Sequence, residues 1–216
     1  MLKHLLLILV LLPLPAFAAT QPTRQPTILV TGDSLSAAYG MALDQGWVAL
    51  LQKRLREQGY PHAVVNTSVS GETTRGALAR LPAELARHKP AIVLIELGGN
   101  DGLRGQPVKT LRGNLAKMVA LSRQAGAKPV LFEMRLPANY GPQYTEDFRK
   151  SFGAVASAEK VPLVPFMLES IALDPKSFQN DGIHPTATVQ PKLLDTVWPT
   201  LKPLLDQPTG KAARGG

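Results

Sequence analysis

Four short segments of the chain combine glycine with serine, asparagine, aspartate or histidine, which are residue types that carry out acyl transfer. They are residues 32–36 (GDSLS), 70–73 (SGET), 98–102 (GGNDG) and 181–185 (DGIHP). A serine hydroxyl attacks an ester carbonyl when an imidazole removes its proton, and N–H groups stabilise the oxyanion that forms. The four segments together hold every group that this chemistry requires.

The last segment contains an acid and a base three residues apart. Asp181 can reach His184 across one turn, hold the tautomer of the imidazole and stabilise its charged form. After the N-terminal leader, the only other histidines are His62, which follows a proline, and His88, which ends a predicted helix. We therefore expect His184 to be the general base and Asp181 to orient it. The alternative is a solvated Asp-Gly turn beside a surface histidine.

The other three segments would supply the nucleophile and the oxyanion donors. Ser34 follows a predicted strand, where its hydroxyl is presented at the edge of the sheet and its own N–H is left unpaired. Gly71 lets a backbone N–H approach a substrate oxygen, and the amide of Asn100 is a neutral donor. Each segment alone is also compatible with an ordinary helix cap or turn.

The elements that must position these segments alternate between short apolar runs and longer helical patterns. Predicted strands are residues 27–31, 63–68, 91–97, 128–134 and 161–165, and predicted helices are residues 47–58, 73–88, 108–125, 145–159 and 187–205. Continuous apolar strands separated by helices are typical of a parallel sheet that is buried on both faces. The pattern predicts an α/β fold, a three-layer α/β/α sandwich with a five-stranded, mainly parallel sheet, whose ligand site lies beyond the carboxyl ends of the strands.

The ends of the chain differ in composition from the rest. Residues 1–18 have the basic start, apolar run and Ala-x-Ala end of a signal peptide, and the apolar run is too short to span a bilayer comfortably. We predict a linker over residues 19–26, one hydrolase domain over 27–206 and a disordered tail over 207–216. A cleaved signal peptide predicts a periplasmic or secreted protein.

Composition excludes several classes of function. The 216 residues contain no cysteine, which removes cysteine nucleophiles and cysteine-ligated metals. The formal charge of +8 falls to +7 without the leader, whose only charged residue is Lys3. The basic residues are scattered and not interleaved with aromatics, so we expect no nucleic-acid partner, although transient contact with an anionic membrane surface is compatible with this charge. There is no motif for a metal or a dinucleotide, and the oligomeric state is not determined by the sequence, with a monomer as the default.

Taken in order, the four segments resemble the conserved blocks of the SGNH (GDSL) hydrolase family. Further segments at residues 77–83 (ALARLPA), 96–105 (ELGGNDGLRG), 135–141 (RLPANYG) and 161–166 (VPLVPF) are similar to its branch of bacterial periplasmic acyl-CoA thioesterases, lysophospholipases and arylesterases. The resemblance implies Ser34, Asp181 and His184 as the catalytic triad, and the Ser34 and Gly71 N–H groups and the Asn100 side chain as the oxyanion hole. It also implies a mobile loop at residues 76–82, and from resemblance and composition we expect an apolar acyl pocket that includes Leu78, Leu81, Leu136 and Tyr140.

The implied activity is hydrolysis of small-molecule esters and thioesters with apolar acyl groups, including acyl-CoA thioesters, aryl esters and lysophospholipids. The reaction would pass through an acyl-enzyme intermediate and use no cofactor. One alternative is an esterase that removes acetyl groups from carbohydrates or cell-wall polymers with the same triad. The other is a noncatalytic lipid-binding protein that keeps the fold, which has no need for all three triad residues.

Overall fold

The structure is a computed structural model that describes residues 25–205 of the chain. The predicted signal peptide, most of the predicted linker and the predicted C-terminal tail lie outside the described residues. Within the described part, no helix is both long enough and apolar enough to cross a membrane.

A parallel sheet forms the centre of the fold, in the order β2-β1-β3-β4-β5. Its strands are β1 (Thr27–Gly32), β2 (Ala63–Asn66), β3 (Ile92–Glu96), β4 (Lys128–Phe132) and β5 (Leu163–Val164). All residues of β1 and β3 are buried, because these central strands are covered on both faces. The five strands were predicted from their continuous apolar runs, and the predicted three-layer fold is confirmed.

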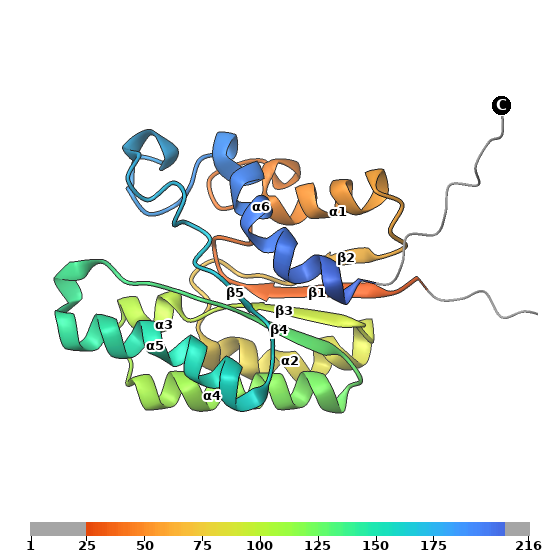
Figure 1. Ribbon diagram of the computed structural model, residues 1–216, viewed down its shortest axis with the longest axis horizontal. Helices are drawn as coiled ribbons and strands as arrows, with labels where there is room; N and C mark the ends of the chain where they lie inside the picture. Colours follow the sequence, from red (N-terminus) through yellow and green to blue (C-terminus); the bar gives the residue numbers. More distant parts are fainter. Residues whose placement is uncertain (1–24, 206–216) are drawn as a thin grey trace, which may run out of the picture.

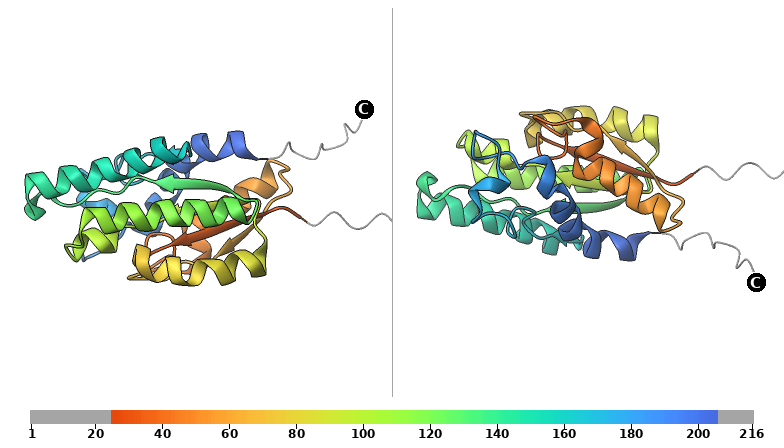
Figure 2. Two further views of the ribbon diagram at one scale, coloured as in Figure 1. Left: turned by 90° about the horizontal axis from the view of Figure 1, so that it is seen from below. Right: turned by 90° about the horizontal axis from the view of Figure 1, so that it is seen from above.

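Helices cover both faces of this sheet. Figure 1 shows α1 (Trp47–Glu57) and α6 (Gln190–Leu201) on one face, with α2 (Thr74–His88), α4 (Val108–Gln124) and α5 (Pro142–Glu159) on the other. The views in Figure 2 show the same two helical layers from below and from above. Short 3-10 helices lie in the connections, namely η1 (Leu43–Gln45), η2 (Ala138–Tyr140), η3 (Pro175–Ser177), η4 (Ala187–Val189) and η5 (Lys202–Leu204).

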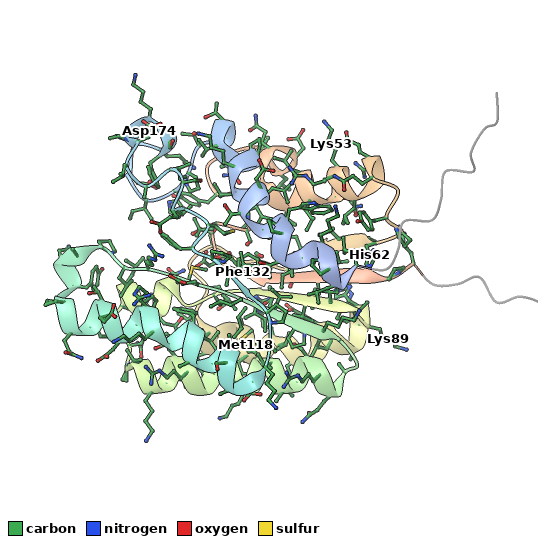
Figure 3. The ribbon with its side chains drawn as sticks, in the orientation of Figure 1. Lys53, His62, Lys89, Met118, Phe132 and Asp174 are labelled. Carbon is green, nitrogen blue, oxygen red and sulfur yellow. The ribbon has the colours of Figure 1, made fainter. Side chains whose placement is uncertain are left out.

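The apolar stripe of each helix explains how it packs on the sheet. In α1 the buried residues are Trp47, Val48, Leu51 and Leu55, which repeat at helical spacing along one side. The Trp47 ring lies 5.9 Å from that of Phe132 in β4, measured between centroids. Below the sheet, Met118 of α4 is fully buried (Figure 3). The two apolar layers give the sheet a rigid frame from which the strand ends project.

Several strands are shorter than predicted, and the helix predicted at residues 187–205 is divided into η4, α6 and η5. Three other differences concern the start of a helix, an additional helix and a predicted loop. Helix α5 begins at Pro142, three residues before the predicted start, since proline is favoured in the first turn of a helix. Residues 99–103, expected as a loop, form the short helix α3 (Gly99–Leu103). The loop expected at residues 76–82 is wrong, because these residues lie inside α2 and Leu81 is fully buried there.

Candidate active site

Two polar segments that are far apart in the chain meet beyond the carboxyl ends of the strands. The Ser34 Oγ lies 2.8 Å from His184 Nε2, although 150 residues separate the two in sequence. The Nδ1 atom of His184 lies 2.6 Å from Asp181 Oδ2. The hydroxyl, imidazole and carboxylate therefore form a continuous chain of hydrogen bonds, which is the geometry that lets a serine pass its proton to histidine.

The Asp181 carboxylate is built into the turn that carries His184. Its Oδ1 accepts the backbone N–H groups of Ile183 and His184, both at 2.9 Å, while Oδ2 faces the imidazole. The His184 backbone N–H, followed by the His184 side chain and the Ile183 N–H, lowers the pKa of Asp181 to about 2. This carboxylate therefore stays charged over the whole pH range in which an imidazole titrates, and it keeps the proton of His184 on Nδ1.

The turn after β1 presents Ser34. The Asp33 Oδ1 accepts the backbone N–H of Leu35 at 3.0 Å, and Ala37 donates its N–H to the Asp33 carbonyl at 2.9 Å. This helical turn begins directly at the end of a buried strand, so its position is fixed by the sheet. Ala38 closes the turn with a φ of +56°, a conformation that few residues other than glycine adopt.

Gly71 lies in the exposed connection between β2 and α2. Its φ of +78° belongs to the left-handed region that glycine adopts without strain. Arg104, at the end of α3, donates a hydrogen bond from Nη2 to the Gly71 carbonyl at 3.0 Å. That contact fixes the orientation of the peptide plane on the carbonyl side of Gly71.

Asn100 lies in the first turn of α3, directly after β3. Its Nδ2 donates to Asp33 Oδ2 at 3.1 Å, which ties it to the residue before Ser34. The chain reaches this position through Gly98, whose φ is +119°. A Cβ there would lie 2.9 Å from the Phe152 ring, so only glycine fits. The structure thus joins Ser34, His184 and Asp181 in one chain of hydrogen bonds, and it joins Asn100 to Asp33, the residue before Ser34.

Tyr39 and Gln179 lie at the site, and neither was anticipated from the sequence. The ring of Tyr39 lies over His184, with 4.3 Å between the ring centroids, and about half of Tyr39 is exposed. Gln179 Nε2 donates to the carbonyls of Tyr39 at 2.8 Å and Pro185 at 3.1 Å, so it joins the serine segment to the histidine segment. No spacing or motif marks either residue, because their role arises from contacts across 140 residues.

Behind the serine turn, two buried carboxyl groups lie close together. Glu96, fully buried at the end of β3, accepts from Ser36 Oγ at 2.5 Å and from the Asp33 N–H at 3.4 Å, both at Oε2. Burial, and then the charge of Asp33, raises the pKa of Glu96 well above its ordinary value. Burial also raises the pKa of Asp33, to about 6, against the opposing effects of Leu35, His184 and Asn100.

The remaining predicted residues fall elsewhere. His62 and Lys89, the neighbour of His88, lie at the amino ends of the strands, opposite the site (Figure 3). Leu81 is fully buried in the core and is therefore not part of an open acyl pocket. Leu136 and Tyr140 lie against α3, where Tyr140 donates its hydroxyl to the Leu103 carbonyl at 3.1 Å. Beside the site, a hollow of about 680 Å³ is lined by Tyr39, Gly40, Gln179, Asn180 and Asp181.

A parallel α/β/α fold with this set of side chains at the strand ends defines the class of SGNH-type hydrolases. The model of the GDSL-like lipase/acylhydrolase family matches residues 30–190, which is most of the chain. The chain belongs to this family, and the resemblance seen in its sequence is confirmed.

Relatives and solved structures agree with this assignment. Over 186 residues, the chain is 57% identical to esterase TesA of Pseudomonas aeruginosa, covering 86% of this chain and 92% of that protein. It is 43% identical over 200 residues to thioesterase 1/protease 1/lysophospholipase L1 of Escherichia coli K12, covering 93% and 92%. The crystal structure of TesA superposes with a TM-score of 0.81 at 58% identity, covering 83% of this chain and 99% of that one. Esterase EstA from Pseudoalteromonas sp., inhibited by monoethylphosphonate, gives 0.79 at 43% identity, covering 82% and 97%.

Proposed function

We propose that the protein is a serine esterase that hydrolyses carboxylic esters and thioesters with apolar acyl groups. Ser34 is the nucleophile, His184 the general base and Asp181 the residue that orients the imidazole. The single observation that carries this proposal is the pair of contacts at His184, 2.8 Å to the Ser34 hydroxyl and 2.6 Å to the Asp181 carboxylate. These distances are within the range for proton transfer between positioned groups.

The reaction has two steps. The Ser34 Oγ forms a bond to the acyl carbon while its proton moves to His184 Nε2, and the carbonyl oxygen becomes an oxyanion. The oxyanion collapses, the bond to the alcohol or thiol breaks, and His184 gives its proton to that leaving group. In the second step water attacks the acyl carbon while its proton moves to His184. The bond between the acyl carbon and Ser34 Oγ then breaks, the acid is released, and His184 returns the proton to Ser34.

The oxyanion hole in this proposal has three donors. They are the backbone N–H groups of Ser34 and Gly71 and the Nδ2 of Asn100. In support, Asn100 is tied to the serine turn and Gly71 is tied to α3 by Arg104. Removal of one such donor lowers the rate by roughly 10² to 10³ fold in serine hydrolases, so each donor is open to a mutational test.

The substrate class follows from the relatives and from the surface around the site. Relatives are named as an esterase, an arylesterase and a thioesterase/lysophospholipase. Among the described residues, the exposed apolar side chains include Tyr39 over His184 and Ile183 in the histidine turn. We assign acyl-CoA thioesters, aryl esters and lysophospholipids as the substrates. We further propose that the enzyme is exported, either periplasmic or secreted, and monomeric. It would make transient contact with membrane surfaces and have no nucleic-acid partner.

Labelling with a fluorophosphonate probe tests the nucleophile. We expect one adduct, mapped by mass spectrometry to Ser34, and we expect Ser34→Ala to remove both labelling and ester hydrolysis. Ser157→Ala, an exposed serine of α5, is the matched control and should label as the wild type does. An adduct at any other residue would overturn the assignment. Hydrolysis of p-nitrophenyl acetate alone, with none of the octanoate or decanoate, would favour an acetyl esterase.

A further inference from the structure

Asp33, the residue before the nucleophile, has no role in the mechanism proposed above. It nevertheless contacts Asn100, one of the proposed oxyanion donors. Asp33 is 3% exposed, and its Oδ2 accepts a hydrogen bond from Asn100 Nδ2 at 3.1 Å. Its other oxygen accepts the Leu35 N–H at 3.0 Å. The two carboxylate oxygens therefore have different partners, one in the serine turn and one on α3.

The side chain of Asn100 has two faces with opposite hydrogen-bonding character. An amide that turns by 180° about its last bond exchanges its N–H₂ for its carbonyl oxygen, with almost no change in shape. Only the N–H₂ face stabilises an oxyanion, and the carbonyl face would repel it. Something must therefore hold the amide in one of the two orientations.

An ionised carboxylate is suited to this task because it accepts hydrogen bonds and donates none. Asp33 Oδ2 can accept a hydrogen bond only from the N–H₂ group of Asn100. One N–H of that group bonds to Asp33, and the second can donate to an oxyanion. Glycine at position 99 leaves room beside this contact, since a Cβ there would lie 3.3 Å from Asp33 Oδ2, a tight contact. We propose that Asp33 is a positioning residue of the oxyanion hole, which fixes the orientation of the Asn100 amide through this hydrogen bond.

The surroundings of Asp33 support an ionised form at the pH of an esterase assay. Burial raises the pKa of Asp33 to about 6, while the Leu35 N–H, His184 and Asn100 favour the charge and Asp101 opposes it. Glu96 beside it is fully buried, and its pKa lies well above the ordinary value. At pH 8, above this pKa of about 6, Asp33 is therefore charged, and it accepts the hydrogen bond from Asn100 as a carboxylate.

The inference rests on the proposed function, and the substitution Asp33→Asn separates the two roles of Asp33. The Asn side chain keeps the size and can keep an oxygen toward the Leu35 N–H. Its N–H₂ group then faces the N–H₂ group of Asn100, which is unfavourable because both groups are donors. A rotation of the Asn100 amide by 180° removes this repulsion with the smallest structural change. We expect kcat for p-nitrophenyl octanoate at pH 8 to fall by roughly 10² to 10³ fold, as for loss of one oxyanion donor, with KM changed by less than about threefold.

A double-mutant cycle with Asn100→Ala shows whether Asp33 acts through Asn100. We expect kcat of the double variant Asp33→Asn/Asn100→Ala to be no lower than that of the slower single variant. Without the Asn100 amide, the change at Asp33 has no oxyanion donor to misorient. Independent effects would multiply, and that result, or full kcat in Asp33→Asn, would overturn the inference. Asp195→Asn, which alters an exposed carboxylate paired with Arg54 on α1, is the control and should keep wild-type kcat.

A replacement variant covers the case in which Asp33→Asn does not fold, and the single variants separate the inference from the proposed function. If circular dichroism shows that Asp33→Asn is unfolded, the same cycle with Asp33→Ala replaces it, and its effect on kcat should again be smaller in the Asn100→Ala background than in the wild type. If Asn100→Ala alone keeps full turnover, the proposed oxyanion hole is wrong and the inference falls with it. If Asn100→Ala is slow but Asp33→Asn is not, only the positioning role of Asp33 is wrong.

Discussion

Carboxyl groups of the same chemical type have different pKa values at this site because their surroundings differ. Asp181 is exposed and accepts two backbone N–H groups, so its pKa is lowered to about 2. Asp33 is buried and its pKa is raised to about 6, and Glu96 is buried more deeply with a pKa raised well above its ordinary value. The pairing of Asp181 with His184 could be predicted from their spacing. The contacts of Asp33 and Glu96 could not, because both depend on burial and on partners more than 60 residues away.

Asp181→Asn tests the role of the charge at the histidine. The amide can still accept the two backbone N–H groups, but it then presents its N–H₂ group to Nδ1 and favours the imidazole tautomer with the proton on Nε2, which is unable to accept the Ser34 proton. We expect kcat to fall by about 10⁴ fold with little change in fold, measured with p-nitrophenyl esters and circular dichroism. Asp174→Asn, in the nearby loop, is the control, and a loss below tenfold in Asp181→Asn would contradict the proposed role.

Among the elements, the five strands and the long helices could be predicted from the sequence, because the apolar residues of each follow the pattern of a buried strand or of a helix. Helix α3 was not, since its sequence Gly-Asn-Asp-Gly-Leu contains weak helix formers and reads as a turn. Tertiary contacts explain why it forms. Asp101 Oδ2 accepts the N–H of Thr74, and Oδ1 accepts the Thr74 hydroxyl, at 2.8 and 2.5 Å. Gly102 lies against Phe148 and Leu136, where a Cβ would not fit.

Asp101→Ala tests how much this link between α3 and α2 contributes. The change leaves the buried N–H of Thr74 without its acceptor, so we expect the free energy of unfolding in urea to fall by about 1 to 3 kcal/mol. Because α3 carries Asn100, we also expect kcat to fall. Asp195→Ala, which removes an exposed ion pair, should cost less than about 1 kcal/mol. Equal stability of the two variants would show that Asp101 does not hold α3 in place.

For the whole molecule, the strand order brings together groups that the sequence keeps apart. The chain runs from β1 outward to β2 and then crosses back to β3 on the other side of β1. In open α/β sheets ligands bind where the strand order reverses in this way, and the turns with Ser34 and Asn100 follow β1 and β3, the two strands at the reversal. Alternation of strands and helices predicted a parallel sheet and a site at this edge. It did not predict which strands are neighbours, which depends on how the helical layers pack.

Glu96, at the end of β3, connects this buried site to the stability of the molecule as a whole. Its folded pKa lies well above 4.5, its ordinary value, so the folded state holds a proton that the unfolded chain releases as the pH rises. The contribution of Glu96 to stability is therefore fully present below about pH 4.5 and is lost as the pH rises toward its folded pKa. Glu96→Gln has no such titration. We expect the free energy of unfolding of the wild type minus that of Glu96→Gln to decrease between pH 4.5 and pH 8.

Urea unfolding at several pH values, followed by circular dichroism, measures this difference. Glu57→Gln is the matched control, because Glu57 is an exposed residue of α1 whose carboxylate lies 3.9 Å from Lys53. The Glu57→Gln variant shows what the replacement of a carboxylate by an amide does at an exposed position. A wild-type minus Glu96→Gln difference that stays constant from pH 4.5 to pH 8 would mean that Glu96 is ionised in the fold. In that case burial would not hold the proton on Glu96, and two charged carboxylates would lie behind the serine turn.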